Sequence, residues 1–404
     1  MLSPYAIYDT APPPGVPVLD IDPFSASFFD DPFPAHEAMR EAGPFVWLGQ
    51  YNIGAVARYE HVREALTDWE RFSSARGVGM EDFERHGRFR LPSLILEADP
   101  PLHTRSRGVL SRALSPPVLK GLRAGFAAEA EAIVEQVVAA GRFDAVRDLA
   151  EAYPLRVFPD AMGMKREGRE KLLPHAEMLF NSFGPRNALF EASRAQASFD
   201  WIEEQGRREN LSPGLGLVIH EAADRGEISS DEAPLLVRAL LQAGLDTTVN
   251  AIGATLYCLA RFPDQWERLR AEPALAKAAF DEAIRFESPV QTFFRTATRD
   301  TEIGGARVQE GDKILMMLAS ANRDPRQWDA PDRYDITRKT LGHVGFGAGI
   351  HQCVGQILAR MEGELVLDAL VRRVKRIRIA GDVVRRHNNT LRGLASLPVE
   401  VERA

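Results

Sequence analysis

Apolar side chains recur at helical spacing through most of this chain, most densely after residue 116. Apolar residues three or four positions apart share one face of a helix, and that face packs against a core. The spacing predicts amphipathic helices at 34–42, 59–69, 118–140, 167–183, 191–208, 230–261 and 263–270. Helices therefore account for most of the predicted structure.

Strand-like patterns are fewer and shorter. Aromatic and β-branched residues mix with glycine at 45–57, as in a hairpin, and two more strand groups are expected at 302–318 and 371–401. No alternation of strand and helix is visible, which argues against a doubly wound parallel sheet. The pattern indicates one mainly α domain, residues 1–404, with a small β part. A Pro-rich, extended and mobile arm is expected at residues 1–17.

The composition is that of a soluble globular protein, with 45% hydrophobic and 26% charged residues. The net charge of −7 gives no overall basic field that would attract nucleic acid. The N-terminal region lacks a basic segment followed by an apolar one, and no run of about 18 apolar residues occurs. We therefore expect a cytoplasmic protein with neither a nucleic-acid nor a membrane partner.

The chain has two cysteines in very different surroundings. Cys258 lies in an apolar helical run, which predicts a packed thiol. Cys353 lies in the segment 346–355, which reads Phe-Gly-Ala-Gly-Ile-His-Gln-Cys-Val-Gly and precedes another helix. Glycine permits tight turns and a close approach to a flat ligand, and helix N-terminal amides favour a thiolate. The segment therefore predicts a thiolate that acts as a metal ligand or as a nucleophile.

This segment resembles the cysteine loop of cytochrome P450 enzymes at every defining position, including the Leu-Ala-Arg at 358–360 that continues into the helix. The resemblance covers essentially the whole chain and implies a single, mainly α cytochrome P450 fold. It implies haem b as the cofactor, Cys353 as the thiolate ligand of its iron, and Phe346 and Gly347 at the haem. The implied activity is that of a monooxygenase, which consumes O2 and two electrons.

The predicted helix at 230–261 contains a local conflict. Gly244 and the polar residues 246–248 are poor helix formers inside an otherwise apolar helix. Such a conflict is typical of a functional site. The stretch resembles the acid–alcohol pair of the family, which implies that Asp246 and Thr247 support proton delivery during oxygen activation. The alternative is a threonine hydrogen-bonded to the preceding turn beside a surface aspartate.

The carboxylates of haem require cationic or hydrogen-bonding partners, and arginine can bind a carboxylate through two parallel hydrogen bonds. The resemblance implies four such residues, namely His103, Arg107, Arg295 and His351. Taken singly, each of them is also compatible with an ordinary surface ion pair.

Glu282 and Arg285 lie three residues apart, a spacing that on an isolated helix is worth only about 0.2–0.5 kcal/mol. Together with Arg333 they resemble the buried, ion-paired triad that supports the cysteine loop in the family. Loss of one partner from such a desolvated network costs about 3–5 kcal/mol. The role implied for all three residues is structural.

Arg107, Arg112 and Arg360 are expected on the cysteine side of the haem, where they would form a basic patch on an acidic protein. Such a patch suits an acidic iron–sulfur ferredoxin, because complementary charge raises encounter rates. The glycines at 345–349 do not match a dinucleotide-binding fingerprint, and the fold uses the whole chain. The electrons are therefore expected from a separate ferredoxin and its NAD(P)H-dependent reductase.

Three segments, 90–103, 180–185 and 236–241, resemble a bacterial subgroup that oxidises para-substituted benzoic acids such as 4-methoxybenzoate. In that subgroup a polar cluster binds the carboxylate, and apolar side chains hold the ring. The residues implied to form this pocket are Arg90, Ser93, Leu96, Phe180, Phe183, Arg238, Ala239 and Phe293. The alternative is that they are ordinary loop and core residues, since aromatics at helical spacing belong to the core more often than to a pocket.

Ala239 departs from this subgroup, which has a serine whose hydroxyl also reaches the carboxylate. Loss of one hydrogen bond to a charged group costs about 1.5–3 kcal/mol. We therefore expect para-substituted benzoates to bind more weakly than in serine-bearing relatives, or a different small acid, such as a cinnamate, to be the substrate. A non-catalytic haem sensor or carrier and a peroxide-driven peroxygenase are further alternatives. The acid–alcohol pair argues against both.

Overall fold

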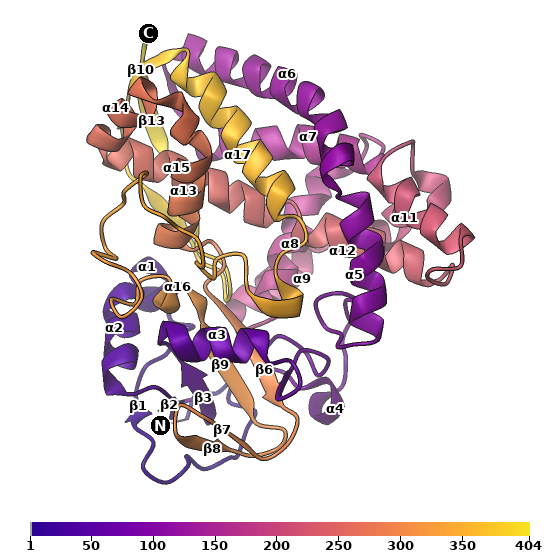
Figure 1. Ribbon diagram of the computed structural model, residues 1–404, viewed down its shortest axis with the longest axis vertical. Coiled ribbons are helices and arrows are strands. Elements are labelled where there is room, and N and C mark those ends of the chain that lie inside the picture. Colours follow the sequence, from indigo (N-terminus) through magenta and orange to yellow (C-terminus); the bar gives the residue numbers. More distant parts are fainter. Residues whose placement is uncertain (1) are drawn as a thin grey trace.

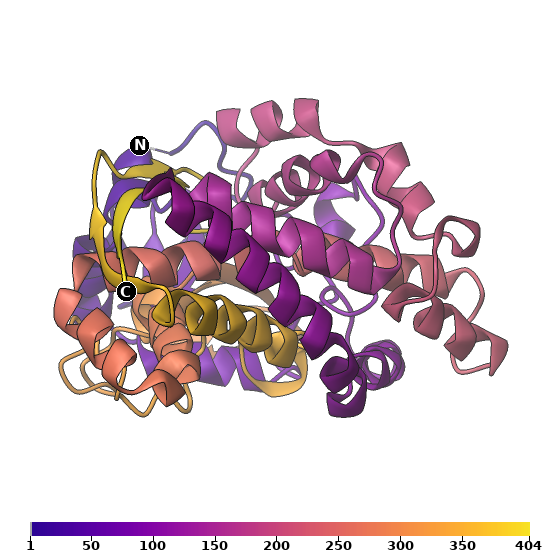
Figure 2. The same ribbon diagram turned by 90° about the horizontal axis from the view of Figure 1, so that it is seen from above.

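The computed structural model describes residues 2–404. The α-helices are Ala26–Asp30 (α1), Phe33–Ala42 (α2), Tyr59–Thr67 (α3), Phe83–His86 (α4), Leu102–Ala113 (α5), Pro116–Ala140 (α6), Ala152–Met162 (α7), Leu172–Asn181 (α8), Ala188–Gln196 (α9), Phe199–Gln205 (α10), Leu215–Asp224 (α11), Glu232–Ala243 (α12), Asp246–Arg261 (α13), Pro263–Ala271 (α14), Ala276–Glu287 (α15), Leu318–Ala321 (α16) and Gln356–Val371 (α17). Helices fill the larger part of the molecule, and α6 and α17 run side by side (Figure 1, Figure 2).

The strands are short and gather mostly at one end of the molecule (Figure 1). They are Val18–Leu19 (β1), Val46–Leu48 (β2), Ile53–Val56 (β3), Phe72–Ser73 (β4), Arg142–Asp144 (β5), Thr292–Ala297 (β6), Thr301–Ile303 (β7), Ala306–Val308 (β8), Lys313–Met317 (β9), Val374–Ile379 (β10), Val384–Arg386 (β11), Gly393–Ser396 (β12) and Pro398–Arg403 (β13). The largest sheet has the order β1-β2-β3-β9-β6-β4, in which β1–β2 and β3–β9 are parallel pairs. The predicted mainly α fold with a small β part is confirmed.

The central helix is α13, in which every residue from Thr248 to Ala260 is buried. It packs against α15, α17 and α14, which together form much of the main hydrophobic core. Cys258 lies in this core and is fully buried, so the predicted packed thiol is confirmed. A helix that is apolar on all sides lies inside a large core, whereas an amphipathic helix lies at its surface.

The helices predicted at 191–208 and 167–183 are wrong in their extent. The segment predicted at 191–208 forms α9 and α10, separated by extended backbone at Ala197. The buried Phe190 and Ile202 are 12 residues apart, so on one continuous helix they would point about 120° away from each other. The break allows both side chains to be buried. The helix predicted at 167–183 begins only at Leu172, after Gly168 adopts a φ of 81°.

Several observed helices lie outside the predicted ranges, among them α5, α7 and α11. The first is largely polar at its exposed positions, and the second contains Pro154 and Pro159, which lack the amide proton that a helix uses. These residues have a weak intrinsic preference for helix, so tertiary packing must stabilise the helices. In α7, for example, Pro159 is buried.

Residues 6–13 of the N-terminal arm form neither helix nor strand, and the arm contacts the body of the protein. The Tyr8 hydroxyl donates to Met80 O at 2.7 Å, and Asn52 Nδ2 donates to Tyr8 O at 3.1 Å. The predicted mobility of the arm stays a prediction, and residue 1 lies outside the described residues. None of the described helices has the length and the apolar character needed to span a bilayer.

Candidate functional site

The cysteine loop forms a tight turn immediately before α17. Cys353 N donates to Phe346 O at 2.8 Å, which closes the loop, and α17 begins at Gln356. Gly347 and Gly349 have φ values of 71° and 68°, a conformation that favours glycine. A Cβ on Gly349 would lie 2.8 Å from Leu66 O. The glycines are therefore required by the backbone, as the sequence predicted.

The Cys353 sulfur is subject to opposing effects. Burial raises the pKa of the thiol, whereas the amides of Gly355 and Gln356 and the charges of Arg107 and Arg360 lower it. Burial is the larger effect, so the pKa stays above its usual value. The helix N-terminus favours a thiolate, as expected, but does not produce one unaided. A bound metal cation would supply the remaining stabilisation, because a coordinated thiol is deprotonated.

Buried nitrogen donors without partners lie near this loop. His103 Nε2 has no hydrogen-bond partner among residues 2–404, and His351 Nε2 has only Asp99 Oδ1 at 3.9 Å, beyond hydrogen-bond distance. The two rings are 4.4 Å apart. Arg295 on β6 is buried, and its guanidinium donates to the adjacent carbonyl of Phe294 at 2.9 Å. Burial lowers the pKa of Arg295 to about 10 and that of His103 to about 4.

Such unpaired donors are costly in a protein interior unless a ligand satisfies them. Two histidines and an arginine match the hydrogen-bonding needs of a haem, which has two carboxylates. Arg107 on α5 differs, because it donates to Gln352 O and so also contacts the cysteine loop. The residues therefore fit a haem bound through Cys353.

The helix predicted at 230–261 is not continuous, and it breaks at the local conflict around Gly244. It divides into α12 and α13, with Gly244 and Leu245 between them. A Cβ on Gly244 would lie 2.6 Å from Phe158 Cζ, so close packing requires glycine here. Thr247 Oγ1 donates to Ala243 O at 2.8 Å, across the break. The threonine is therefore hydrogen-bonded to the preceding turn, as the alternative interpretation held.

Asp246, by contrast, is not a surface residue. It is 3% exposed, and Asn250 Nδ2 donates to its Oδ1 at 3.2 Å. Burial raises the pKa of Asp246 to about 7, although the charge of Arg386 partly offsets this rise. A carboxyl group that titrates near neutrality can both accept and donate a proton at working pH. This half of the alternative interpretation is wrong.

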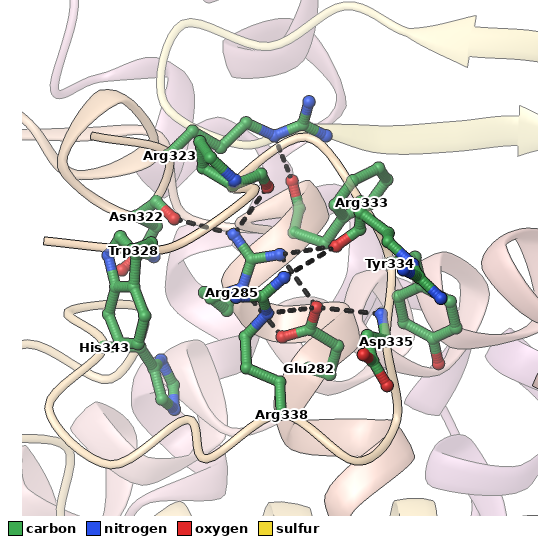
Figure 3. Close-up of polar contacts among 12 residues, drawn as sticks. Glu282, Arg285, Asn322, Arg323, Trp328, Arg333, Tyr334, Asp335, Arg338 and His343 are labelled. Atoms are coloured by element: carbon green, nitrogen blue, oxygen red, sulfur yellow. Dashed lines mark hydrogen bonds and ion pairs between the residues drawn. The ribbon is translucent and has the colours of Figure 1, made fainter. Parts of the chain in front are cut away.

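The ion network behind the cysteine loop differs from the predicted triad in one member. Arg285 donates from Nε and Nη2 to the two oxygens of Glu282, at 2.7 Å and 2.8 Å. The second guanidinium belongs to Arg338, whose Nε lies 3.1 Å from Glu282 Oε1 (Figure 3). Arg333 contributes only its main-chain carbonyl, which accepts from Arg285 and Arg338.

The prediction is therefore wrong for the Arg333 side chain. The physical reason is the direction of the chain. The chain after α16 brings the carbonyls of Asn322, Pro331 and Arg333 to Arg285. The chain at residues 335–338 then returns to Glu282, where Asp335 N donates to Oε1 at 3.1 Å.

The apolar residues predicted to hold the substrate ring lie together. Phe180 and Phe293 each have ring centroids 5.7 Å from that of Phe183. Leu96 packs on the same cluster, together with Leu391 of the C-terminal loop. The segments that carry these residues are far apart in sequence, so the fold assembles an aromatic wall from α8, β6 and two loops.

The polar residues predicted beside this wall are also close to it, but Arg90 already has a partner. Its guanidinium carbon is 5.7 Å from the centre of the Phe183 ring. Its Nη2 and Nη1 donate to the two oxygens of Glu97, at 2.6 Å and 2.8 Å. Ser93 Oγ accepts from the amide of Leu96 at 3.2 Å, which leaves its hydroxyl hydrogen free to donate.

Arg238 on α12 is the less satisfied arginine. It is 6% exposed, its Nη2 donates to Leu91 O at 3.2 Å, and its Nε has no partner among residues 2–404. Glu203 lies 3.5 Å away, on an exposed side chain. Burial, followed by the charges of Arg238 and Arg90, lowers the pKa of the nearby His175 to about 4. Ala239 follows on the same helix and is buried.

Several residues that shape this site were not predicted from the sequence. Glu97 pairs with Arg90, and Gln242 Nε2 donates to His175 Nε2 at 2.8 Å. Asn389 of the C-terminal loop joins the chain after α8, where its Nδ2 donates to Asn181 O at 2.9 Å. Glu97 lies in the segment 90–103, but no pattern in the sequence distinguishes it or the other residues as part of the site. No sequence signal could have found them without their partners.

The basic residues expected on the cysteine side are partly neutralised. Arg360 Nε donates to Asp281 Oδ1 at 2.7 Å, and Arg112 forms an ion pair with Glu227. Arg112 is the most exposed of the three, with 56% of its side chain accessible. The patch therefore has a weaker field than three free arginines would give.

Comparison with known proteins agrees with this site. The family model for cytochrome P450 matches residues 203–401. The chain is 60% identical to cytochrome p450 CYP199A2 of Rhodopseudomonas palustris over 391 residues, which cover 96% of this chain and 95% of that protein. It is 30% identical to 6-deoxyerythronolide B hydroxylase of Saccharopolyspora erythraea over 406 residues, which cover 96% and 99% of the two chains.

A solved structure extends the comparison to three dimensions. Cytochrome P450 CREJ in complex with (4-ethylphenyl) dihydrogen phosphate superposes with a TM-score of 0.84 at 26% identity. The superposition covers 94% of this chain and 99% of that one. The likeness therefore extends over nearly the whole fold.

Proposed function

This chain belongs to the cytochrome P450 family of monooxygenases, which carry haem b with a cysteine thiolate ligand, and on that premise we propose that it oxidises a small para-substituted aromatic acid. The overall reaction consumes the acid, O2, two electrons and two protons and releases an oxidised product and water. Hydroxylation and oxidative O-demethylation of a para substituent both follow this balance.

When bound, haem supplies the oxygen chemistry, and the residues of this chain bind and orient the other reactants. Cys353 provides the ligand, while His103, His351 and Arg295 provide donors for the haem carboxylates. Asp246 is buried at a break in the central helix and titrates near neutrality, so it can take up and release a proton there.

The observation that carries the substrate class is a buried, unsatisfied arginine beside an aromatic wall. Arg238, like Arg90, has an unpartnered Nε, but unlike Arg90 it has no buried acid partner. Its charge interacts with that of Arg90, whose guanidinium carbon lies 5.7 Å from the centre of the Phe183 ring. An aromatic ring can pack on the phenylalanines while its carboxylate receives hydrogen bonds from Arg238 and Ser93. The complex of cytochrome P450 CREJ with a para-substituted phenyl phosphate supports the idea that this fold accommodates such an anion.

A cinnamate is the second candidate substrate. Ala239 stands on α12 next to Arg238, where the benzoate-oxidising subgroup has a serine. Without that hydroxyl, the carboxylate end of the proposed pocket has more room for a ligand and one hydrogen-bond donor fewer. A longer acid could then place its carboxylate at the same arginine.

For electron supply we propose a separate iron–sulfur ferredoxin that is reduced by an NAD(P)H-dependent reductase. Arg112 on α5 is largely exposed, and Arg107 and Arg360 lie near Cys353, so this face has a local excess of arginine. Such a face favours an acidic partner. Reduction by ferredoxin should slow as ionic strength rises and slow further in Arg112→Glu.

Binding of matched ligands tests the substrate class. We expect 4-methoxybenzoate to bind at least tenfold more tightly than its amide, because a charged acceptor gains more from a buried arginine. Arg238→Gln should remove this preference, whereas Arg208→Gln, an exposed arginine paired with Asp224, should not. Spin-state absorbance titrations with both ligands and with 4-methoxycinnamate measure the affinities. Equal binding of acid and amide by the unaltered protein would refute the proposal.

A further inference from the structure

Glu97 occupies the charged end of the proposed pocket. Its side chain is 1% exposed, and its oxygens accept from Arg90 Nη2 at 2.6 Å and Nη1 at 2.8 Å. The amide of Ser93 donates to Glu97 Oε2 at 2.9 Å. Both terminal nitrogens of Arg90 are therefore bound to an internal carboxylate before any ligand enters.

The charges at this end of the pocket are unevenly balanced. Arg90 and Glu97 cancel each other, while Arg238 has only the exposed Glu203 at 3.5 Å, where solvent weakens the interaction. His175 adds no charge at neutral pH, because burial lowers its pKa to about 4. The buried positive charge that remains for a ligand is that of Arg238.

Lys313 on β9 is a further cation whose charge interacts with that of Glu97. Its Nζ donates to Gly77 O at 2.7 Å and to Arg76 O at 3.3 Å, so its hydrogen bonds are directed to main-chain oxygens. Burial lowers its pKa to about 7, and the charges of Asp82 and Glu97 partly offset that change. Lys313 therefore cannot bind a ligand carboxylate through two parallel hydrogen bonds, as an arginine can.

Building on the proposed function, we propose that Glu97 is a specificity-determining residue that occupies Arg90 and leaves recognition of the substrate carboxylate to Arg238 and Ser93. A carboxylate held by two parallel hydrogen bonds reproduces the geometry that an acid substrate would adopt on a free arginine. Glu97 thus takes the place of a ligand carboxylate at Arg90. It limits the attraction of the pocket for acids to that of one arginine.

The Arg90–Glu97 pair affects acid binding more in this chain than it would in a relative with a serine at position 239. Ala239 contributes no hydroxyl to the carboxylate end. The donors left for an acid are then the Arg238 guanidinium and the Ser93 hydroxyl. The charge state of the Arg90–Glu97 pair therefore decides how strongly acids are preferred over neutral ligands.

A double-mutant cycle on the haem-loaded protein tests the inference, with 4-methoxybenzoate and its amide as ligands in calorimetric titrations. Glu97→Gln keeps the shape of the side chain and releases the charge of Arg90, so the acid should bind roughly tenfold more tightly or better. Arg90→Gln strands the buried Glu97 anion, so the acid should bind at least tenfold more weakly. The double variant removes a pair without net charge, and its affinity for the acid should stay within about threefold of the original. Glu203→Gln serves as the control and should change the affinity less than about threefold.

The outcomes separate this inference from the proposed function. If the unaltered protein binds acid and amide equally, the proposed substrate class fails. If it prefers the acid but the double variant binds as weakly as Arg90→Gln, Arg90 contacts the acid directly and Glu97 is only a support. Should Glu97→Gln fold poorly, as judged by its unfolding midpoint, the comparison of the double variant with the original protein still decides between the two cases.

Discussion

On the cysteine side of the molecule, Glu282 is fully buried, and both of its oxygens are paired with arginines. On the substrate side, Arg238 is nearly as buried, but its Nε has no partner among residues 2–404 and its acid neighbour is exposed. The two regions lie in one fold, yet one satisfies its buried charges internally and the other does not.

The difference indicates which region is built for stability and which for ligand binding. An unsatisfied buried donor costs about 1–3 kcal/mol, so a donor of this kind beside a proposed ligand site is a candidate for binding the ligand. The broken helix between α12 and α13 and the carboxyl of Asp246 belong to the same class of costly features. The Glu282 network, in contrast, satisfies its buried charges within the protein.

The largest expected effect is at Cys353, because the proposed binding of the haem iron depends on its sulfur. Cys353→His should abolish the thiolate-type Soret band of the reduced, CO-bound protein, because no thiolate then ligates the iron. Cys258→Ala should retain the band, since that thiol is fully buried in the main core. Loss of the band in Cys258→Ala and its survival in Cys353→Ser would contradict the ligand assignment.

The second prediction tests the Glu282 network, whose buried charges are paired within the protein. Glu282→Gln should lower the free energy of unfolding by about 3–5 kcal/mol, because it leaves two arginines without their anion. Chemical denaturation measures this change. Arg338→Gln should cost about 1–3 kcal/mol, and Arg333→Gln less than about 0.5 kcal/mol, since the Arg333 side chain is outside the network. A larger loss in Arg333→Gln than in Arg338→Gln would restore the triad predicted from the sequence.

The third prediction concerns the stability that the folded protein loses by burying the ionised carboxyl of Asp246. Asp246→Asn should slow turnover by about a hundredfold, as loss of an acid–base group commonly does. It should also stabilise the protein at pH 8 by roughly 2–4 kcal/mol, because the native carboxyl titrates near pH 7 rather than near 4. The native state then binds more protons than the unfolded state, so the free energy of unfolding falls as the pH rises from about 4 to 7.

Steady-state turnover and unfolding at pH 5 and pH 8 measure both effects. Thr247→Ala is the companion variant, and it should still bind substrate and consume NAD(P)H but divert more electrons to hydrogen peroxide. The change in stability that Thr247→Ala causes should be the same at pH 5 and pH 8, because this variant keeps Asp246 and threonine does not titrate. Unchanged turnover and coupling in both variants would remove the pair from the mechanism.

The smallest expected effect sharpens the comparison at the substrate side. Ala239→Ser should tighten 4-methoxybenzoate by about tenfold, since one more donor reaches a charged acceptor. Absorbance titration measures the affinity, and the amide, which carries no charge, should gain less. Tightening of the amide by the same factor would show that the serine acts through shape and not through the carboxylate.

The sequence alone determined those features that depend on neighbouring residues. Cys353 with its glycines defines a loop whose positive φ angles at Gly347 and Gly349 only glycine adopts readily. The conflict around Gly244 predicted where the central helix breaks, because poor helix formers stand together inside an apolar run. Local backbone preference is a property of a few consecutive residues, so the order of the residues suffices to predict both features.

Tertiary structure decided every feature that needs a partner from elsewhere in the chain. Arg90 was recognised as a cation near the pocket, but its pairing with Glu97 depends on how residues 90–97 turn. In the same way, the choice of Arg338 over Arg333 depends on the path of the chain beyond α15. Charge pairing depends on distances of about 3 Å between side chains, and only the folded backbone sets those distances.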